Sequence, residues 1–185
     1  MPTVVIPYRG DAKRRLPAPL RAAVALAMLG DVVEAALAVG EVLVVTDDPV
    51  AVPPGAAAVA DPGAGLGAAV AAGLALVQGD VLVVNADLPC ATPDALRRLA
   101  AHGLALVEAR DATTNALSLP GRSRPDPSLL PTLYGPGSAD RFRAHAPFAT
   151  AAIPELRDDV DTLDDLERLG HRLGRRTRAL LAAAA

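Results

Sequence analysis

Two kinds of apolar pattern alternate along the chain. Short runs of consecutive apolar residues, often β-branched, predict strands that are buried on both faces, as in a parallel sheet. Longer stretches rich in Ala and Leu predict helices. The predicted strands are Thr3–Tyr8, Val42–Thr46, Ala56–Ala60, Val81–Asn85, Leu104–Ala109 and Asn115–Leu119. The predicted helices are Leu20–Leu37, Leu66–Val77, Pro93–Ala101 and Thr162–Leu173.

This alternation predicts the fold class. Strands that alternate with helices form βαβ units, so we expect a single α/β domain with a mixed, mostly parallel sheet flanked by helices. Thr92-Pro93 supplies an N-cap and a Pro for the first helical turn, and Thr162 with Asp165 resembles a capping box. The stretch Pro120–Pro131 predicts a loop. We expect residues 1–174 to form the domain and residues 175–185 a basic, Ala-rich tail.

Composition narrows the class of protein. The 185 residues include no Trp, two Tyr and two Phe, so the core must be aliphatic, and the net charge of −3 predicts no nucleic-acid partner. The longest apolar stretch, Ala22–Leu29, is shorter than the roughly 18 residues of a membrane span. A chain that opens into a strand shows no signal peptide, and the single Cys90 excludes an intrachain disulfide. We expect a cytoplasmic protein that does not contact membranes.

Residues that could bind a ligand or take part in catalysis follow almost every predicted strand. Ligands of open parallel sheets bind beyond the carboxyl ends of the strands, so these residues should meet at one edge. They are Lys13, Asp47-Asp48, Asp61–Gly67, Asp87 and Thr113–Asn115.

Lys13 is the only lysine among 18 basic residues. A lysine offers a compact, rotatable charge that suits a mobile phosphate, whereas arginine offers a planar fork. The alternative is a solvated basic turn before a helix.

The glycines at 63, 65 and 67 have the spacing G-x-G-x-G, which is not the dinucleotide fingerprint. They lead into the helix that begins near Leu66, whose free amides and dipole could hold phosphate. A flexible connector is the alternative.

The segment Asp159-Val160-Asp161 predicts a cation site. In an extended segment the two carboxylates share a face, and their repulsion is relieved by a cation. Mg²⁺ prefers a few carboxylates, with water and phosphate completing its shell, and Asp87 could be the third carboxylate. The alternative is helix capping by Asp161 and Thr162.

The turn Tyr134–Ser138 brings a hydroxyl and free amides to the start of a helix. It could be an anion-binding nest, or simply a loop followed by Ser138 as an N-cap. We expect Cys90 to be a small buried residue and not a nucleophile, because no histidine is its neighbour in sequence.

Six motifs, taken in order, resemble the guanylyltransferases of deazaflavin coenzyme F-420 biosynthesis, which transfer GMP from GTP to phosphoenolpyruvate or 2-phospho-L-lactate. The resemblance runs from about residue 3 to residue 170. The motifs are Lys13-Arg14-Arg15-Leu16, Asp61-Pro62-Gly63-Ala64-Gly65-Leu66, Ala86-Asp87-Leu88-Pro89, Thr114-Asn115-Ala116-Leu117, Gly135-Pro136-Gly137-Ser138 and Asp159-Val160-Asp161-Thr162.

The resemblance implies a nucleotidyltransferase fold of the nucleotide-diphospho-sugar transferase type, and a Mg²⁺-dependent enzyme that uses GTP and a small phosphorylated carboxylate. It gives Lys13 and Asp87 catalytic roles, and we also expect that a homodimer could form. The implied sites are Mg²⁺ at Asp87, Asp159 and Asp161, phosphoenolpyruvate at Thr114, Gly135 and Ser138, and the GTP phosphates along Lys13, Gly65 and Leu66.

The chain departs from the family pattern at three positions. Gly67 stands where the family often has Asn, which removes a side-chain amide from the nucleotide site. Arg14 replaces a usual Ser, and Tyr134 replaces a usual Phe. Two alternatives stay open: a nucleotidyltransferase of the molybdopterin or sugar-phosphate type, and a non-catalytic nucleotide-binding module.

Overall fold

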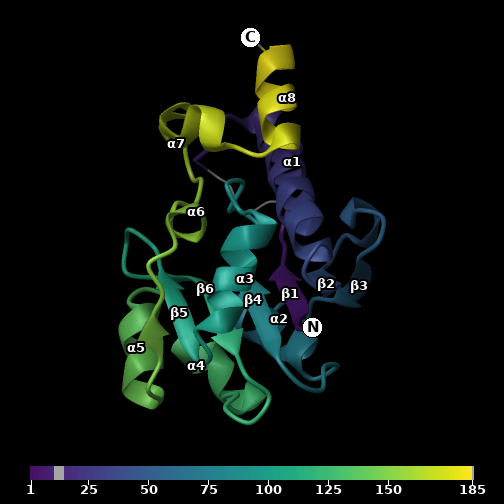
Figure 1. Ribbon diagram of the computed structural model, residues 1–185. Coiled ribbons are helices and arrows are strands. Elements are labelled where there is room, and N and C mark those ends of the chain that lie inside the picture. The colour runs from purple at the N-terminus through teal and green to yellow at the C-terminus, as the bar shows by residue number, and fades with distance from the viewer. Residues whose placement is uncertain (11–14, 185) are drawn as a thin grey trace.

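A computed structural model describes residues 1–10 and 15–184, and its centre is a seven-stranded sheet in the order β3-β2-β1-β4-β6-β5-β7 (Figure 1). Each of the six predicted strands is present within one residue of its predicted ends, and β7 is an addition. The strands are β1 Thr3–Pro7, β2 Glu41–Thr46, β3 Ala57–Ala60, β4 Val81–Val84, β5 Ala105–Glu108, β6 Thr114–Leu119 and β7 Ala149–Thr150.

The sheet is parallel except at one strand. β1 pairs in parallel with β2 and β4, β2 with β3, and β5 with β7, whereas β6 runs antiparallel to both β4 and β5. The carboxyl ends of the parallel strands therefore share one edge with the start of β6. The predicted fold class, a mixed and mostly parallel sheet flanked by helices, is confirmed.

Eight α-helices and three short 3-10 helices occur in the described residues. Two predicted caps are confirmed: the Thr92 hydroxyl accepts the N–H of Ala95, and Thr162 and Asp165 form a capping box. The helices are α1 Ala18–Leu37, α2 Leu66–Leu74, α3 Pro93–Ala101, α4 Leu130–Leu133, α5 Ser138–His145, α6 Pro154–Arg157, α7 Leu163–Leu169 and α8 Arg175–Ala184, with the 3-10 helices η1 Pro49–Ala51, η2 Pro127–Leu129 and η3 Gly170–Arg172.

Some predicted boundaries are wrong. The helix expected over Thr162–Leu173 ends at Leu169, because Gly170 adopts a φ of +44° that no α-helix continues, and η3 follows. The predicted loop Pro120–Pro131 contains η2 and the start of α4. The helix expected over Leu66–Val77 also ends early, at Leu74. The local pattern alone does not specify such helix ends and short elements.

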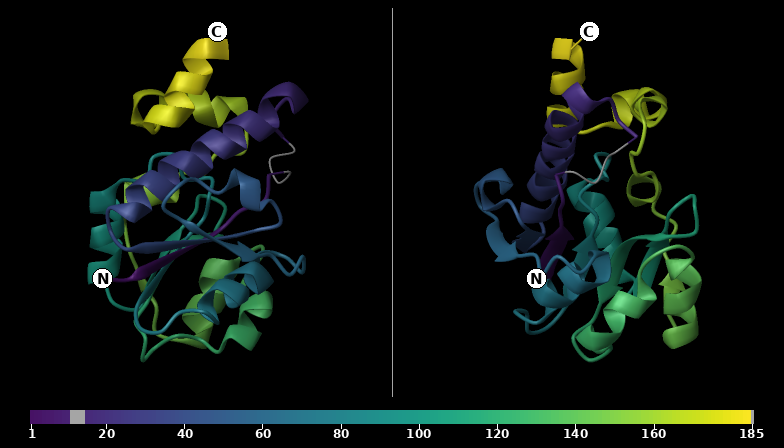
Figure 2. Two further views of the ribbon diagram at one scale, coloured as in Figure 1. Left: turned by 90° about the vertical axis from the view of Figure 1, so that its right-hand side faces the viewer. Right: turned by 180° about the vertical axis from the view of Figure 1, so that it is seen from behind.

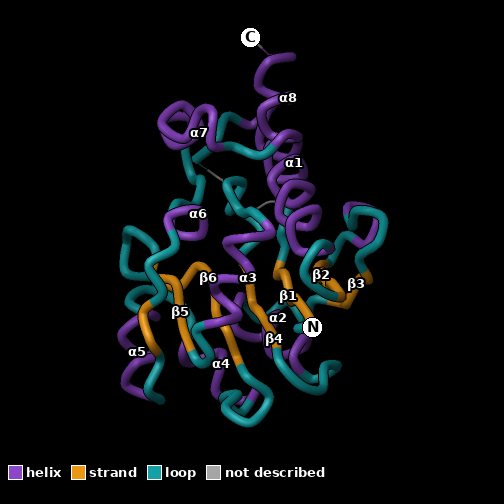
Figure 3. Tube along the Cα trace, in the orientation of Figure 1, coloured by secondary structure: helices purple, strands orange, loops and turns teal. Residues whose placement is uncertain are grey.

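Helices cover both faces of the sheet, which gives three layers (Figures 2 and 3). Side chains alternate between the faces along β1: Val4 and Ile6 lie in the core beneath α1 and α3, whereas Val5 lies in the core shared with α2, α4 and α5. A Cβ at Gly73 of α2 would lie 2.5 Å from a methyl group of Val5. Glycine at this position therefore lets α2 lie close to the sheet.

The C-terminal helix α8 is attached to α1, beside which it lies in Figure 1. The buried carboxylate of Asp31 in α1 accepts hydrogen bonds from the N–H groups of Arg176 (2.8 Å) and Thr177 (3.0 Å) and from the Thr177 hydroxyl (2.7 Å). Asp31 thus caps the first turn of α8 from another element. None of the helices in the described residues has the length and apolar character needed to cross a membrane.

Candidate active site

A cavity of about 220 Å³ lies beyond the carboxyl ends of β1, β3 and β4. Four of the residues predicted to meet at this edge, Asp61, Gly65, Leu66 and Asp87, line it. The lining residues are Pro7, Tyr8, Arg9, Ala25, Met28, Asp61, Gly65, Leu66, Ala69, Asn85, Ala86 and Asp87. The sequence analysis assigned no role to Tyr8 or Asn85. Each directly follows a strand, and that position could have marked both as candidates.

The glycine loop forms one wall of this cavity. The Asp61 carboxylate accepts the N–H of Gly63 (2.8 Å) and the Arg9 Nε–H (3.1 Å). Gly63 and Gly65 adopt φ values of +75° and +94°, so both need the freedom of glycine. No side chain caps the start of α2. Its first amides and the positive end of its dipole are therefore available to an anion in the cavity.

Gly67, one residue beyond Leu66, packs against another helix. A Cβ at this position would lie 2.4 Å from the carbonyl oxygen of Leu130 and 2.7 Å from the Cα of Pro131. Both atoms belong to the backbone of α4, which could only move as a unit. Glycine at position 67 therefore allows α2 and α4 to touch.

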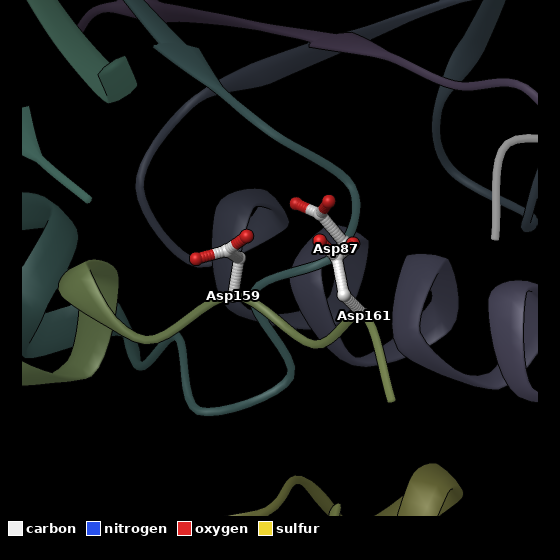
Figure 4. A group of neighbouring side chains, drawn as sticks. All are labelled: Asp87, Asp159 and Asp161. Atoms are coloured by element: carbon white, nitrogen blue, oxygen red, sulfur yellow. The ribbon is translucent and has the colours of Figure 1, made fainter. Parts of the chain in front are cut away.

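Asp87, which lines the cavity, lies close to Asp159 and Asp161, and each of the three offers a carboxylate oxygen within 4.8 Å of the others. Figure 4 shows Asp159 and Asp161 rising from one side of their segment toward the loop of Asp87. Val160 between them is fully buried, and its N–H donates to the Asp87 carbonyl (3.1 Å). The predicted alternation of side chains is confirmed. The side-chain cap of α7 is supplied by Thr162.

The electrostatics of the triad favour a cation. Burial and the charges of Asp87 and Asp161 together raise the pKa of Asp159 to about 6, against opposing hydrogen bonds. One of those bonds comes from the Asn115 amide, which lies 3.5 Å from Asp159 and also donates to the Arg157 carbonyl. Oxygen donors held close together against their mutual repulsion are a donor set suited to Mg²⁺ or a similar hard cation.

The neighbouring Asp158 does not belong to the triad, and its buried carboxylate is bound by three arginines. Its side chain is 5% exposed and accepts from Arg110 (2.6 Å), Arg168 (3.2 Å) and Arg172 (3.0 Å). Burial pushes the pKa of Asp158 up, but hydrogen bonds from Arg110 and Arg172 outweigh burial and hold it below the usual value. Asp158 therefore ties the triad segment to the β5–β6 loop, α7 and η3.

The predicted acceptor residues also come together. Thr114 opens β6 and Ser138 opens α5, and the buried Ser138 hydroxyl donates to the Thr114 hydroxyl (3.1 Å). The expectation that Ser138 is an N-cap is wrong, because Gly137 precedes the helix in a left-handed conformation with φ of +68°. Gly135 has a φ of +110°.

Asp48 caps η1 and does not line the cavity, and Lys13 lies outside the described residues. Cys90 is buried, and its burial raises the pKa of the thiol to about 11. A protonated thiol is a poor nucleophile, which agrees with the expectation that Cys90 has a packing role.

Comparison with known proteins places the chain in a class of transferases. Residues 19–154 match the model of the MobA-like NTP transferase domain, so the chain has the domain of a nucleotidyltransferase. Within that class, the chain is 38% identical to a phosphoenolpyruvate guanylyltransferase of Streptomyces scabiei, covering 97% of this chain and 95% of the relative. The chain therefore belongs to the phosphoenolpyruvate guanylyltransferase family.

Solved structures agree on the fold. A proposed nucleotide-diphospho-sugar transferase from Desulfovibrio desulfuricans G20 superposes with a TM-score of 0.73 at 19% identity, covering 99% of this chain and 95% of that one. A manganese complex from Mycobacterium tuberculosis H37Rv has a TM-score of 0.58 at 21% identity, with coverages of 90% and 96%.

Proposed function

We propose that this protein transfers GMP from GTP to phosphoenolpyruvate and releases pyrophosphate, as in the biosynthesis of coenzyme F-420. The names of its relatives support the reaction. The observation that best supports it is the position of Asp87, which belongs both to the cavity beside the α2 amides and to the acidic triad. One carboxylate is thus shared between a suitable phosphate site and a suitable cation site.

Asp87, Asp159 and Asp161 would hold the divalent cation, for which we propose Mg²⁺. Three carboxylates with room for further oxygen ligands fit its preference, and the triad can bind it only when the carboxylates are ionised. When bound, Mg²⁺ would supply charge neutralisation for phosphate groups that meet there. The manganese complex of a protein with this fold is consistent with a divalent cation.

The chain's own residues would orient the two substrates. We assign the GTP phosphates to the amides at the start of α2, beside Gly65 and Leu66, together with Lys13. We assign the small acid to Thr114, Gly135 and Ser138. An acceptor phosphate is already an anionic nucleophile, so the site needs no general base, and positioning and electrostatic stabilisation would account for most of the catalysis.

The transfer itself is an in-line substitution. An oxygen of the acceptor phosphate forms a bond to the α-phosphorus of GTP, and the bond from that phosphorus to the α,β-bridging oxygen breaks. The bonding electrons leave with pyrophosphate. The products are the guanylylated acid and pyrophosphate.

The test is pyrophosphate release from GTP with phosphoenolpyruvate, 2-phospholactate or 3-phosphoglycerate, with mass spectrometry of the products. Asp87→Asn should reduce the rate at least ~100-fold, because it removes a shared charge at the reacting phosphates. Asp94→Asn is the matched control, since Asp94 is an exposed acid of α3 that pairs with Arg98. Full activity of Asp87→Asn, or no guanylylated product from any acceptor with the parent protein, would contradict the proposal.

A further inference from the structure

Arg141 of α5 makes an unusual set of contacts with the loop that precedes its own helix. Its Nε–H donates to the carbonyl of Leu133 (3.1 Å), one terminal nitrogen to that of Pro136 (2.7 Å) and the other to that of Tyr134 (2.7 Å). All three acceptors are backbone atoms of one short turn. The half-buried guanidinium therefore serves as the support of this turn, and no carboxylate pairs with it in the described residues.

These contacts dictate where two amides point. A trans peptide unit is planar, and its C=O and its N–H point in opposite directions. The carbonyls of Tyr134 and Pro136 point at Arg141, so the N–H groups of Gly135 and Gly137 point away from it. Neither N–H has a hydrogen-bond acceptor among the described residues. The two amides are therefore free to bind a ligand.

The turn also has a backbone shape that depends on glycine. Gly135 and Gly137 both have positive φ values, +110° and +68°, and the Ser138 hydroxyl follows them directly. A Cβ at Gly135 would lie 3.3 Å from a terminal nitrogen of Arg141, so the turn and the guanidinium fit closely. Without Arg141, the three carbonyls would lose a charged donor and the peptide units could rotate.

We propose that Arg141 is a positioning residue for the acceptor: it holds the Gly135 and Gly137 amides in the orientation that binds the carboxylate or phosphate of the small acid. This inference rests on the proposed function, because it deepens the assignment of the acceptor to this loop. Arg141 itself need not touch the acid. Its guanidinium bonds lie on the opposite side of the peptide units.

The experiment compares Arg141→Ala and Arg141→Lys with the parent protein. The measured quantities are KM and kcat for phosphoenolpyruvate and for GTP, and the direct binding of phosphoenolpyruvate by calorimetry. We expect KM and Kd for the acid to rise at least ~10-fold, since two hydrogen bonds to a charged ligand are misdirected, while KM for GTP changes less than ~2-fold. The lysine variant should resemble the alanine variant, because one ammonium cannot reach three carbonyls in a plane.

Two controls separate positioning from simple loss of stability. Arg143→Ala removes an arginine from the same helix, one that contacts Glu108 and Asp140 and no loop carbonyl, and should leave acceptor binding unchanged. Guanidinium added to Arg141→Ala at non-denaturing concentrations should restore part of the acceptor affinity. Thermal melting identifies a variant that is unfolded at the assay temperature, in which case Arg141→Lys is the deciding variant.

The outcomes are distinguishable. If the parent protein binds and uses the acid and the Arg141 variants bind it equally well, the inference is overturned and the proposed function stands. Equal loss of GTP and acceptor affinity also overturns the inference, because the effect is then not confined to the loop. A parent protein that neither binds nor uses any of the acids overturns the proposed function and this inference with it.

Discussion

Replacing Asp159 by asparagine should stabilise the metal-free protein at neutral pH. Burial, with the charges of Asp87 and Asp161, raises the pKa of Asp159 from 3.8 to about 6. At about 1.36 kcal/mol for each pH unit, this difference corresponds to about 3 kcal/mol. Because the side chain is partly exposed, screening by solvent reduces the expected gain to about 1–2 kcal/mol. For a chain of this size, that is a rise in Tm of roughly 2–8 °C.

The sign follows from the number of bound protons. Between pH 4 and pH 6, roughly, the folded protein holds a proton on Asp159 that the unfolded chain has released, so the contribution of this group to stability falls as pH rises through that window. The advantage of Asp159→Asn should therefore be full at pH 7.5 and should shrink towards pH 4. The comparison of the two proteins at each pH cancels the acid sensitivity of other carboxylates.

The assay is chemical or thermal unfolding in chelator, and again with Mg²⁺ or Mn²⁺. Added cation should make the parent more stable than the variant. The parent gains about 2.7 kcal/mol when the cation concentration is a hundredfold above its Kd, whereas the variant has lost a ligand for the cation. Asp164→Asn, an exposed acid in the first turn of α7, is the matched control and should change stability by less than about 0.5 kcal/mol. An Asp159→Asn protein that is no more stable than the parent in chelator at pH 7.5 would refute the electrostatic argument.

Two further substitutions test the connections around the site. Asp31→Ala should lower the free energy of unfolding by about 2–4 kcal/mol and expose the chain near Arg176 to proteolysis, because three hydrogen bonds at the start of α8 lose their acceptor. Thermal melting and limited proteolysis measure the two effects. A variant that is as stable and as resistant to proteolysis as the parent would contradict this prediction. Asp158→Asn should cost about 1–3 kcal/mol, less than a fully buried ion pair because its arginines are partly exposed, and should weaken cation binding by the adjacent triad. Metal titration with Asp164→Asn as control would show the second effect, and unchanged cation affinity would mean that Asp158 only stabilises the fold.

The parts of the fold that could be predicted are those with a strong local signal. Continuous apolar runs such as Val81–Val84 are buried on both faces, and they appear as central strands. The triad was predictable because alternate residues of an extended segment share a face, which requires only the three letters of Asp159-Val160-Asp161. Asp87 could be added from its place at the end of a strand.

The parts that could not be predicted depend on contacts between distant segments. Nothing near Asp31 in the sequence indicates that it caps α8, some 145 residues later. Arg141 is one of 17 arginines in the composition, and only the folded turn shows that its donors meet three carbonyls. The short helices α4 and α6, of four residues each, have too few positions to show a period.

The contact between Gly67 and α4 has an evolutionary consequence. The resemblance noted in the sequence implies asparagine at this position, yet here any side chain would overlap the backbone at Leu130 and Pro131. Asparagine introduced alone at position 67 should therefore be deleterious in this protein. A side chain at this position would be accommodated only together with a shift of α4. The residues that position 67 tolerates therefore depend on the placement of α4, and the two segments constrain each other's sequence.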